Sequence, residues 1–329
     1  TPYTSSAASD VYKRQVYVSA CAWIPARHQG KREMHILMTG GTGLIGTATS
    51  TVLHESGHKL TILTRRAPPA TDDATYVTAL ADCAEPVDAV INLAGAGLAD
   101  RRWSSAYKRQ IVSSRVDLTR ELVAWLGECK QPPSKLISAS AIGYYGAAEA
   151  QTFTENGEPG TGFAAALCQS WEEEAGRAAE YGTQVSLLRL GVVLAREGGA
   201  LGKMTQSFRL GVESWLGSGE QWLSWIHLED VVGVIQHVLN CDHPAGVYNT
   251  VSPEPARHRE LAHEAGRQSN TWLKLGVPAF AARVMAGEMA EELLLSGQRV
   301  LPAQLLEDGF QFHYPNLKEA LADLMSDKG

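Results

Sequence analysis

Short apolar runs alternate with amphipathic stretches along most of this chain. Four stretches are expected to contain strands: the run that begins at Met34, VDAVINLAGAG (87–97), KLISASAIGYYG (135–146, a strand and a turn) and QVSLLRLGVVL (184–194). The second has the near-continuous hydrophobicity of a strand that a parallel sheet buries on both faces. Two longer stretches between them, over about 103–126 and 163–180, repeat their apolar residues at helical spacing. We therefore predict an α/β fold in which strands and helices alternate, a Rossmann-like doubly wound parallel sheet.

Residues 1–33 do not share this pattern. The stretch TPYTSSAASDVYKRQ is small and polar, and a weak apolar patch, VYVSACAWIPA, follows it. An organelle transit segment, a poor secretory signal, and an upstream leader or assembly artefact are three interpretations of such a stretch. We favour the third, a leader outside the fold, because Met34 stands directly before the first convincing strand.

Composition favours work on a small molecule. Of the 329 residues 44% are apolar and 20% are charged, and the net charge of -7 gives no electrostatic footprint for nucleic acid. No run approaches the ~20 apolar residues that cross a bilayer, so we expect no membrane partner. The five cysteines are scattered and contain no C-x-x-C pair, which indicates no metal site and fits a reducing, cytoplasmic location.

A glycine-rich turn follows the first strand. The segment TGGTGLIG places Gly41, Gly43 and Gly46 at the G-x-G-x-x-G spacing of a dinucleotide-binding turn. Such a turn lets the backbone approach a pyrophosphate, and the helix that follows it supplies free N–H groups to the phosphates. No Lys follows Gly46, which argues against a nucleotide-triphosphate loop. The alternative is a glycine-rich turn that binds nothing.

The end of the second strand selects the cofactor. An acidic residue there would accept a hydrogen bond from the ribose 2′-OH of NAD, whereas an Arg accommodates the 2′-phosphate of NADP. This chain has Thr64, Arg65 and Arg66 at that point. We therefore expect NADP(H), with Arg65 as phosphate ligand and Thr64 as hydroxyl donor; the alternative is a solvated basic turn.

Eight motifs in order carry a resemblance to a known family: TGGTGLIG, LTRR, INLAGAG, ADRRW, SASAIGYYG, LRLGVVL, GSGEQWLSWIHLEDVV and GVYNTVSP. They resemble an extended short-chain dehydrogenase/reductase, and more narrowly its atypical branch of epimerase family proteins, the NAD-dependent epimerase/dehydratase-like oxidoreductases. The stretch from VPAFAAR to LKEAL resembles the small C-terminal segment that marks this branch. The similarity runs from Met34 to about Leu324.

The resemblance implies a set of cofactor contacts and a division into domains. The contacts are Gly40, Gly41, Thr42, Gly43, Leu44, Ile45, Gly46, Thr64, Arg65, Leu93, Ala94, Gln110, Arg115 and Val193. For Arg115 the alternative is a surface charge. The expected NADP(H)-binding domain spans 34–195 with sheet contributions from about 225–250, and a smaller substrate lobe comprises 196–225 and 251–329.

The catalytic residues that the resemblance implies are only partly present. In that superfamily a Ser at a strand end works with a Tyr-x-x-x-Lys on the next helix, where Lys lowers the Tyr pKa and Tyr exchanges the carbonyl proton. Ser140 matches the first element. Counting forward, Phe163 and Leu167 stand where Tyr and Lys should be, so the usual pair is replaced. Tyr144, just after Ser140, is our candidate for the missing proton donor.

Each candidate outside that pair has a structural alternative. Tyr144 and its neighbour Tyr145 could simply pack in a turn, and Cys168 is more typical of a small buried residue. His227 and Asp230 could form an acid–base pair or join the sheet to the substrate lobe. Three tryptophans with a Lys or Arg nearby could wall a substrate pocket or form the lobe's core: Trp215, Trp222, Trp225, Lys203 and Arg209.

Three functions of different classes remain open. The first is an NADP(H)-dependent oxidoreductase or epimerase of unknown substrate with a rearranged proton donor. The second is a catalytically silent NADP(H)-binding regulatory or scaffold protein, which the missing Tyr and Lys favour. A sugar-nucleotide binding module without redox chemistry is a third. Extended relatives often dimerise through the two helices that here include 103–126 and 163–180, so a homodimer is a further expectation.

Overall fold

The computed structural model describes residues 33–66, 73–83, 86–241, 246–269 and 271–326. Residues 1–32 of the expected leader lie outside the described residues. Among the described residues, no helix is both long and apolar enough to cross a bilayer.

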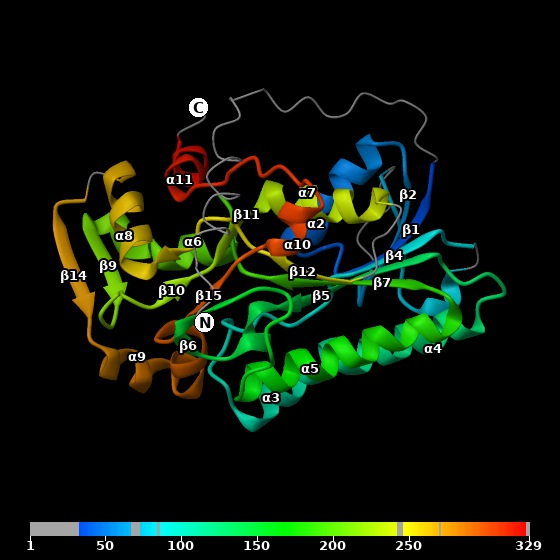
Figure 1. Cartoon of the computed structure of the whole chain (residues 1–329), viewed down its shortest axis with the longest axis horizontal. Coiled ribbons are helices and arrows are strands. Elements are labelled where there is room, and N and C mark those ends of the chain that lie inside the picture. Colours follow the sequence, from blue (N-terminus) through cyan, green and yellow to red (C-terminus); the bar gives the residue numbers. More distant parts are fainter. Residues whose placement is uncertain (1–32, 67–72, 84–85, 242–245, 270, 327–329) are drawn as a thin grey trace, which may run out of the picture. The chain divides into compact units, whose positions relative to one another are not determined.

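A seven-stranded parallel sheet forms the centre of the nucleotide-binding half (Figure 1). Its strands, in spatial order, are β12 (Gly246–Thr250), β7 (Gln184–Leu190), β5 (Lys135–Ala141), β4 (Ala89–Asn92), β1 (His35–Thr39), β2 (Lys59–Leu63) and β3 (Thr75–Val77). The chain runs outward from β1 to β3 and then resumes on the other side of β1 with β4. This reversal confirms the doubly wound Rossmann-like fold and places a ligand crevice at the carboxyl ends of β1 and β4.

Helices cover both faces of the sheet (Figure 1). On one face lie α2 (Leu44–Glu55) and α7 (Leu228–Asn240), and on the other α3 (Ser105–Val112), α4 (Leu118–Glu128) and α5 (Phe163–Gly176). Alternate residues of β1 enter the two cores: Ile36 and Met38 pack with α2 and α7, whereas Leu37 packs with α4. All three side chains are fully buried.

The helix expected over about 103–126 is interrupted. A turn of π-helix, η2 (Ser113–Asp117), separates α3 from α4. Single π-helical turns inside α-helices are rare and occur frequently at functional sites. Arg115 lies in this turn.

The smaller lobe is built from short elements. They are α6 (Gly199–Met204), η5 (Gln206–Leu210), β9 (Val212–Leu216), β10 (Trp222–Leu223), β13 (Ala256–Arg257), α8 (His258–Gln268), β14 (Leu273–Val277), α9 (Ala279–Ala286), η6 (Ala290–Leu294) and α11 (Leu317–Met325). Connecting segments complete the two halves: η1 (Leu80–Asp82), η3 (Ile142–Tyr145), β6 (Ala148–Phe153), η4 (Arg177–Tyr181), β8 (Val192–Leu194), β11 (Trp225–His227), β15 (Gln298–Val300) and α10 (Ala303–Glu307). Strand β15, late in the chain, pairs with β6 in the nucleotide-binding half.

Candidate functional site

The glycine turn closes tightly between β1 and α2. A Cβ on Gly46 would lie 2.1 Å from the Gly40 carbonyl oxygen, and a Cβ on Gly40 would lie 2.6 Å from the Leu93 carbonyl carbon. Gly40 also has a φ of 71°, which disfavours L side chains. These two positions therefore need glycine for packing alone, with or without a ligand.

Gly43 is the glycine that packing does not require. It is exposed, its φ of -87° suits any residue, and a Cβ there would meet only the Gly40 carbonyl oxygen, at 3.3 Å. The first amide bonded within the helix belongs to Thr47, whose N–H donates to the Gly43 carbonyl at 2.8 Å. The N–H groups of Leu44, Ile45 and Gly46 precede that bond, and no acidic side chain stands in the first turn. A cradle of this kind, open to solvent at Gly43, fits a pyrophosphate.

A buried polar network holds the opposite side of the crevice. Asn92, at the end of β4, accepts from the Thr39 hydroxyl at 2.7 Å and donates to the hydroxyls of Thr119 and Ser138 at 2.8 and 3.1 Å. The backbone N–H of Leu93 donates to the Thr39 carbonyl, and that of Ala94 to the Thr39 hydroxyl. The network therefore fixes the Leu93–Ala94 backbone beside the glycine turn.

Thr64 and Arg65 follow β2 at the same edge of the sheet. The Thr64 N–H donates to the Val77 carbonyl and its hydroxyl to the Arg66 carbonyl, while the Arg65 side chain is exposed. No described carboxylate forms an ion pair with Arg65. Its guanidinium is therefore available to a phosphate at the point where the sequence expects one.

Arg115 lies against the backbone that follows β4. A Cβ built on Gly95 would come within 2.7 Å of the Arg115 Cζ, so the guanidinium rests directly on that glycine. The guanidinium also lies 5.3 Å from the Trp171 ring centroid and forms no ion pair with a described carboxylate. Burial lowers the pKa of Arg115 below its usual range. A half-buried cation without a counter-charge favours the anion-binding interpretation over a surface charge.

The other expected cofactor contacts lie in two places. Val193, on β8, packs against the core that Ile45 also contacts, and a Cβ on Gly199 would meet both the Val193 carbonyl and the Leu44 side chain at 3.2 Å. The structure thus brings Val193 to the glycine turn. Gln110 instead has an exposed side chain on α3, in a hollow lined by Lys108, Arg109 and Ser113.

Ser140 is tied to a buried ion pair that the sequence interpretation missed. Its hydroxyl donates to Glu172 of α5 at 2.5 Å, and Arg189 of β7 donates twice to the same carboxylate, at 2.8 Å each. The Glu172 and Arg189 side chains are 9% and 4% exposed. Burial alone would lower the pKa of Arg189, but its bonds to Glu172 outweigh burial and raise it. The signal was a single Arg inside the apolar run QVSLLRLGVVL.

The helix positions that face the end of β5 lie one residue after Phe163 and Leu167. A Cβ on Gly143, beside Ser140, would lie 3.3 Å from the Ala164 Cβ and 3.8 Å from the Cys168 Sγ. Phe163 faces elsewhere: its ring lies 5.0 Å from that of Trp103, and Leu167 is buried in the same apolar cluster. Ala164 and Cys168, not Phe163 and Leu167, are therefore the helix positions that face the strand end.

Neither replacement supplies an exchangeable proton or a positive charge at neutral pH. Ala164 has no polar group. Cys168 is 3% exposed, and burial raises the pKa of its thiol to about 11, so the thiol stays neutral. This supports the structural interpretation of Cys168.

Tyr144 and Tyr145 have different environments. Tyr145 is buried, and its hydroxyl donates to Asn249 at 2.6 Å and accepts from Arg189 at 2.9 Å. Tyr144 is half-buried, and the Arg189 Cζ lies 3.4 Å from its ring centroid. Its hydroxyl forms no hydrogen bond with the described residues. The cation therefore orients the ring while the phenol remains available.

The C-terminal segment closes over the start of α5. Glu292 accepts from the backbone N–H groups of Phe163 and Ala164 at 3.0 and 2.8 Å and so caps the helix. Ala282, Ala286 and other residues of α9 and η6 complete the apolar cluster around Leu167 and Trp103. The start of α5 and its Leu167 side are thus packed against this segment.

His227 and Asp230 serve the fold. His227 caps α7 by accepting from the Glu229 N–H at 3.1 Å, and burial lowers its pKa to about 4. Asp230 accepts from the backbone N–H groups of His313 and Tyr314, and burial raises its pKa to about 6. These contacts favour the second interpretation of the two residues, which is that they join the sheet to the substrate lobe, over an acid–base pair.

The aromatic and basic residues of the lobe do not share one pocket. Trp225 is fully buried and donates to the Glu254 carbonyl, whereas Trp222 lies under the Arg257 guanidinium. Trp215 packs against His263. Lys203 is exposed and pairs with Asp100, and Arg209 is exposed.

Comparison with known proteins agrees with this geometry. The profile of the NAD dependent epimerase/dehydratase family matches residues 36–250, and a domain of unknown function, DUF1731, matches residues 277–324. The epimerase family protein ML0860 of Mycobacterium leprae is 37% identical over 298 residues, 89% of this chain and 96% of that protein. The human epimerase family protein SDR39U1 is 33% identical over 298 residues, 89% of this chain and all of that protein.

A solved structure extends the likeness to three dimensions. The crystal structure of human epimerase family protein SDR39U1 (isoform 2) with NADPH superposes with a TM-score of 0.82 at 31% identity. The match covers 89% of this chain and 100% of that one. The C-terminal segment and the nucleotide-binding half are therefore both shared.

Proposed function

The chain belongs to the NAD dependent epimerase/dehydratase family, and on that premise we propose that it binds NADP(H) and acts as an atypical oxidoreductase or epimerase. The observation that carries the proposal is the glycine turn, in which Gly43 and three free N–H groups form a cradle, open to solvent at Gly43, that packing alone does not require. The human relative solved with NADPH supports the choice of cofactor.

The residues around the crevice fit NADP(H). The N–H groups of Leu44, Ile45 and Gly46 would hold the pyrophosphate, and Arg65 with Thr64 would hold the 2′-phosphate. The other contacts that we assign are Gly40, Gly41, Thr42, Gly43, Leu93, Ala94, Gln110, Arg115 and Val193. Arg115 adds a second cation on the side of the crevice nearest Ser140, where its uncompensated charge would meet an anionic group.

The proton step falls to Tyr144. The bound cofactor supplies or accepts the hydride of the reaction. In carbonyl reduction the Tyr144 hydroxyl would give its proton to the substrate oxygen, and the phenolate would regain a proton from solvent. The Ser140 hydroxyl already donates its hydrogen bond to Glu172, so toward a substrate hydroxyl it can act only as a hydrogen-bond acceptor. Because Ser140 is only 1% exposed, we assign it as a positioning residue.

A catalytically silent NADP(H)-binding protein is the second candidate. The observation that favours it is the helix face opposite Ser140, where Ala164 and a neutral Cys168 take the places of an acid and a cation. Such a chain would keep the cradle and lose turnover. Both candidate functions include the cofactor. They differ in whether the Tyr144 hydroxyl transfers a proton to a substrate.

Cofactor titration tests the shared part. Trp fluorescence of the full chain is followed during addition of NADPH and, separately, NADH. We expect NADPH to bind more tightly than NADH, and we expect the Arg65→Glu variant to lose this preference. Failure to bind either cofactor refutes the proposal, and tighter NADH refutes the role of Arg65.

Turnover separates the two candidates. Cofactor oxidation is monitored with a panel of carbonyl compounds for the native chain, for Tyr144→Phe and for the control Tyr181→Phe, whose phenol is exposed elsewhere. Loss of turnover in Tyr144→Phe alone, at unchanged NADPH affinity, supports the enzyme. Absence of turnover in a native chain that binds NADPH supports the silent protein.

The register of α5 gives an independent test. Ala164→Tyr with Cys168→Lys should create or raise reductase activity, because these positions face Ser140. Phe163→Tyr with Leu167→Lys is the matched control, with the same two residues introduced one position earlier. Activity in the control pair but not in the first pair contradicts the register, provided that circular dichroism shows both variants folded.

We also assign domains and location. Residues 34–195 with about 225–250 form the NADP(H)-binding domain, and 196–225 with 251–329 form the substrate lobe. The cysteines in the described part of the chain, Cys83, Cys129, Cys168 and Cys241, all carry free thiols. A reducing compartment suits them, and we place the protein in the cytoplasm.

A further inference from the structure

One end of the substrate lobe exposes an unusual number of apolar side chains. Eight large hydrophobic residues are exposed in the described part of the chain, and seven of them lie together here, 42–78% exposed. They are Leu210, Trp272, Leu273, Leu275, Phe280, Val284 and Met285. We call this set the β14–α9 patch. Strand β14 forms the outer edge of the lobe, and α9 follows it directly (Figure 1).

The patch is large enough for a protein interface. At about 100 Å² for each side chain it presents on the order of 700 Å² of apolar surface, against the few hundred Å² that monomers usually leave open. A stable complex of standard size buries ~800 Å² on each partner. The area therefore matches one half of such an interface.

Strand β14 offers an unpaired edge. It pairs in parallel with β9 on one side, and no other described strand pairs with its outer edge. The Leu273 N–H donates to the Gly211 carbonyl and the Val277 carbonyl accepts from the Gly217 N–H, so these residues point their backbone groups inward. The backbone groups of Lys274 and Gly276, between them, point outward. An apolar strand with a free edge readily pairs with another strand.

We propose that the β14–α9 patch is the interface of a homodimer, in which β14 of two copies pair antiparallel about a two-fold axis at Leu275. In this register Lys274 stands opposite Gly276 of the second copy, and their outward backbone groups form hydrogen-bonded pairs. Leu273, Leu275 and Val277 of both copies then share one face of a four-stranded sheet.

The two neighbouring registers of this antiparallel pairing are less stable. An axis at Lys274 would set two lysines directly opposite each other, which is destabilising. An axis at Gly276 would set Lys274 opposite Pro278, which has no N–H to donate. The sequence LKLGVP thus selects the axis at Leu275.

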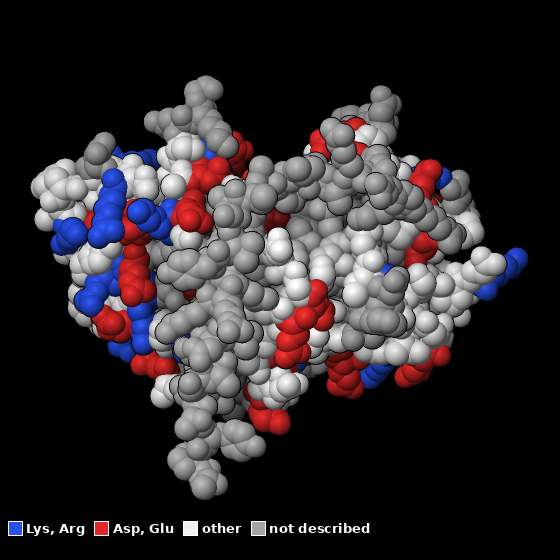
Figure 2. Space-filling view, turned by 45° about the horizontal axis from the view of Figure 1, so that its top comes forward, with Lys and Arg blue, Asp and Glu red and all other residues white. Residues whose placement is uncertain are grey.

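Helix α9 extends the same surface. Its buried side, with Ala282 and Ala286, packs on the cluster around Trp103, whereas Phe280 and Val284 lie one turn apart on its exposed side. Figure 2 shows acidic and basic side chains interspersed at the left end of the lobe, so no charge of a single sign opposes a second copy. A lipid surface fits less well, because the outward backbone groups of Lys274 and Gly276 would lack partners in hydrocarbon.

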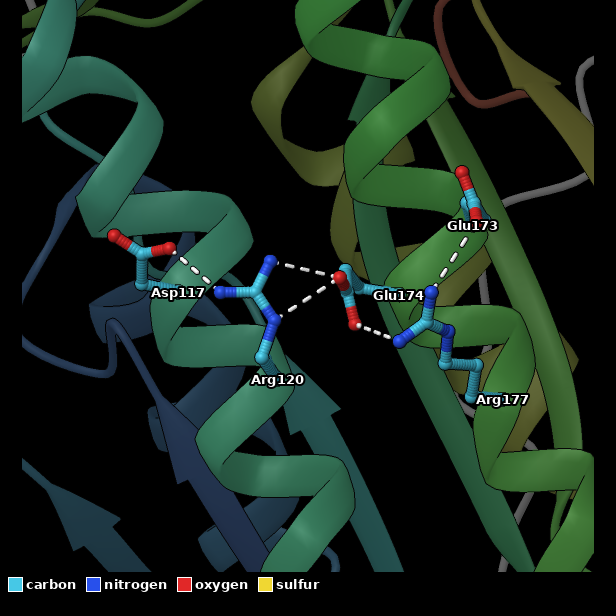
Figure 3. A network of polar contacts seen from close by, with 5 residues as sticks. All are labelled: Asp117, Arg120, Glu173, Glu174 and Arg177. Atoms are coloured by element: carbon cyan, nitrogen blue, oxygen red, sulfur yellow. Dashed lines mark hydrogen bonds and ion pairs between the residues drawn. The ribbon is translucent and has the colours of Figure 1, made fainter.

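The helices that usually join copies of extended relatives are polar in this chain. None of the eight exposed large hydrophobics lies on α3, α4 or α5. Figure 3 shows the ion pairs on these helices. Arg120 of α4 forms ion pairs with Asp117 and with Glu174 of α5. Arg177 forms ion pairs with Glu173 and Glu174. The apolar surface that drives a dimer therefore lies on β14 and α9.

Sedimentation equilibrium of the full chain tests the dimer. We expect a dimer at micromolar concentration, and a monomer for Leu275→Asp, which brings two carboxylates together at the axis. The control Tyr181→Asp changes an exposed hydrophobic residue outside the patch and should leave the dimer intact. Because Leu275 is 52% exposed, the variant should keep its fold, which circular dichroism checks.

Crosslinking tests the register. Residues facing each other across a two-fold axis in a non-hydrogen-bonded pair have Cα atoms ~4.5 Å apart, within disulfide range. Leu275→Cys should therefore form an intermolecular disulfide on mild oxidation, and Lys274→Cys far less. A monomeric native chain, a dimer that survives Leu275→Asp or is broken by Arg120→Glu, or capture of the monomer by anionic vesicles would each overturn the proposal.

Discussion

Removal of the buried carboxylate beside Ser140 is predicted to be costly. Glu172→Gln leaves the Arg189 guanidinium, 4% exposed, without its counter-charge. Breaking one partner of a buried ion pair costs ~3–5 kcal/mol. At about 2.1 cal/mol/K per residue, a fold of roughly 300 residues has an unfolding entropy of about 0.6 kcal/mol/K, so the Tm should fall by roughly 5–8 °C.

The neighbouring carboxylate provides the control. Glu173 is 72% exposed and pairs with Arg177 on the surface, so Glu173→Gln should change stability by less than ~1 kcal/mol. Replacement of both Glu172 and Arg189 by Met should recover part of the loss, because no unpaired charge remains. Both are measured by thermal unfolding followed by circular dichroism. If Glu172→Gln lowers the Tm no more than Glu173→Gln does, the ion pair does not hold the strand end.

Three further predictions concern the cofactor, pH and the helix cap. Arg65→Ala should lower the affinity for NADPH by roughly 10- to 100-fold, which corresponds to the ~1.5–3 kcal/mol of a charged hydrogen bond. The affinity for NADH, measured in the same fluorescence titration, should not change. The pKa of His227 is about 4 in the fold against 6.5 in the unfolded chain, so only the unfolded chain binds its proton between these values. This group alone should therefore add about 3 kcal/mol of stability from pH 4 to 6.5, while Asp230, whose pKa is raised, contributes with the opposite sign. The difference in urea unfolding between the native chain and His227→Asn isolates the histidine, and this difference should grow by that amount over the range. Glu292→Gln should cost ~1 kcal/mol, whereas Glu288→Gln, in a more exposed pair with Lys108, should cost less in the same assay.

The sequence predicts the sheet well because its signal is local. Apolar runs such as 184–194 become strands, and the glycine turn lies where a nucleotide fold needs it. Ala164 and Cys168, each one residue after Phe163 and Leu167, face Gly143, and counting along a helix cannot show which side does so. Glu172 and Glu292 escaped notice since their partners, Arg189 and the start of α5, are 17 and 129 residues away along the chain.

The pairing of β15 with β6 has a consequence for synthesis on the ribosome. Residues 298–300 lie near the end of the chain, yet they complete a segment that begins at Ala148, and Glu292 caps a helix that begins at Phe163. During translation the N-terminus of α5 therefore stays uncapped until more than a hundred further residues have emerged. Domains generally fold as units as they leave the ribosome, and here the unit closes only after residues 292–300 have emerged. A nascent chain whose Glu292 has not yet emerged would expose the apolar face of α5 to chaperones, whereas a chain whose Val300 has emerged would not.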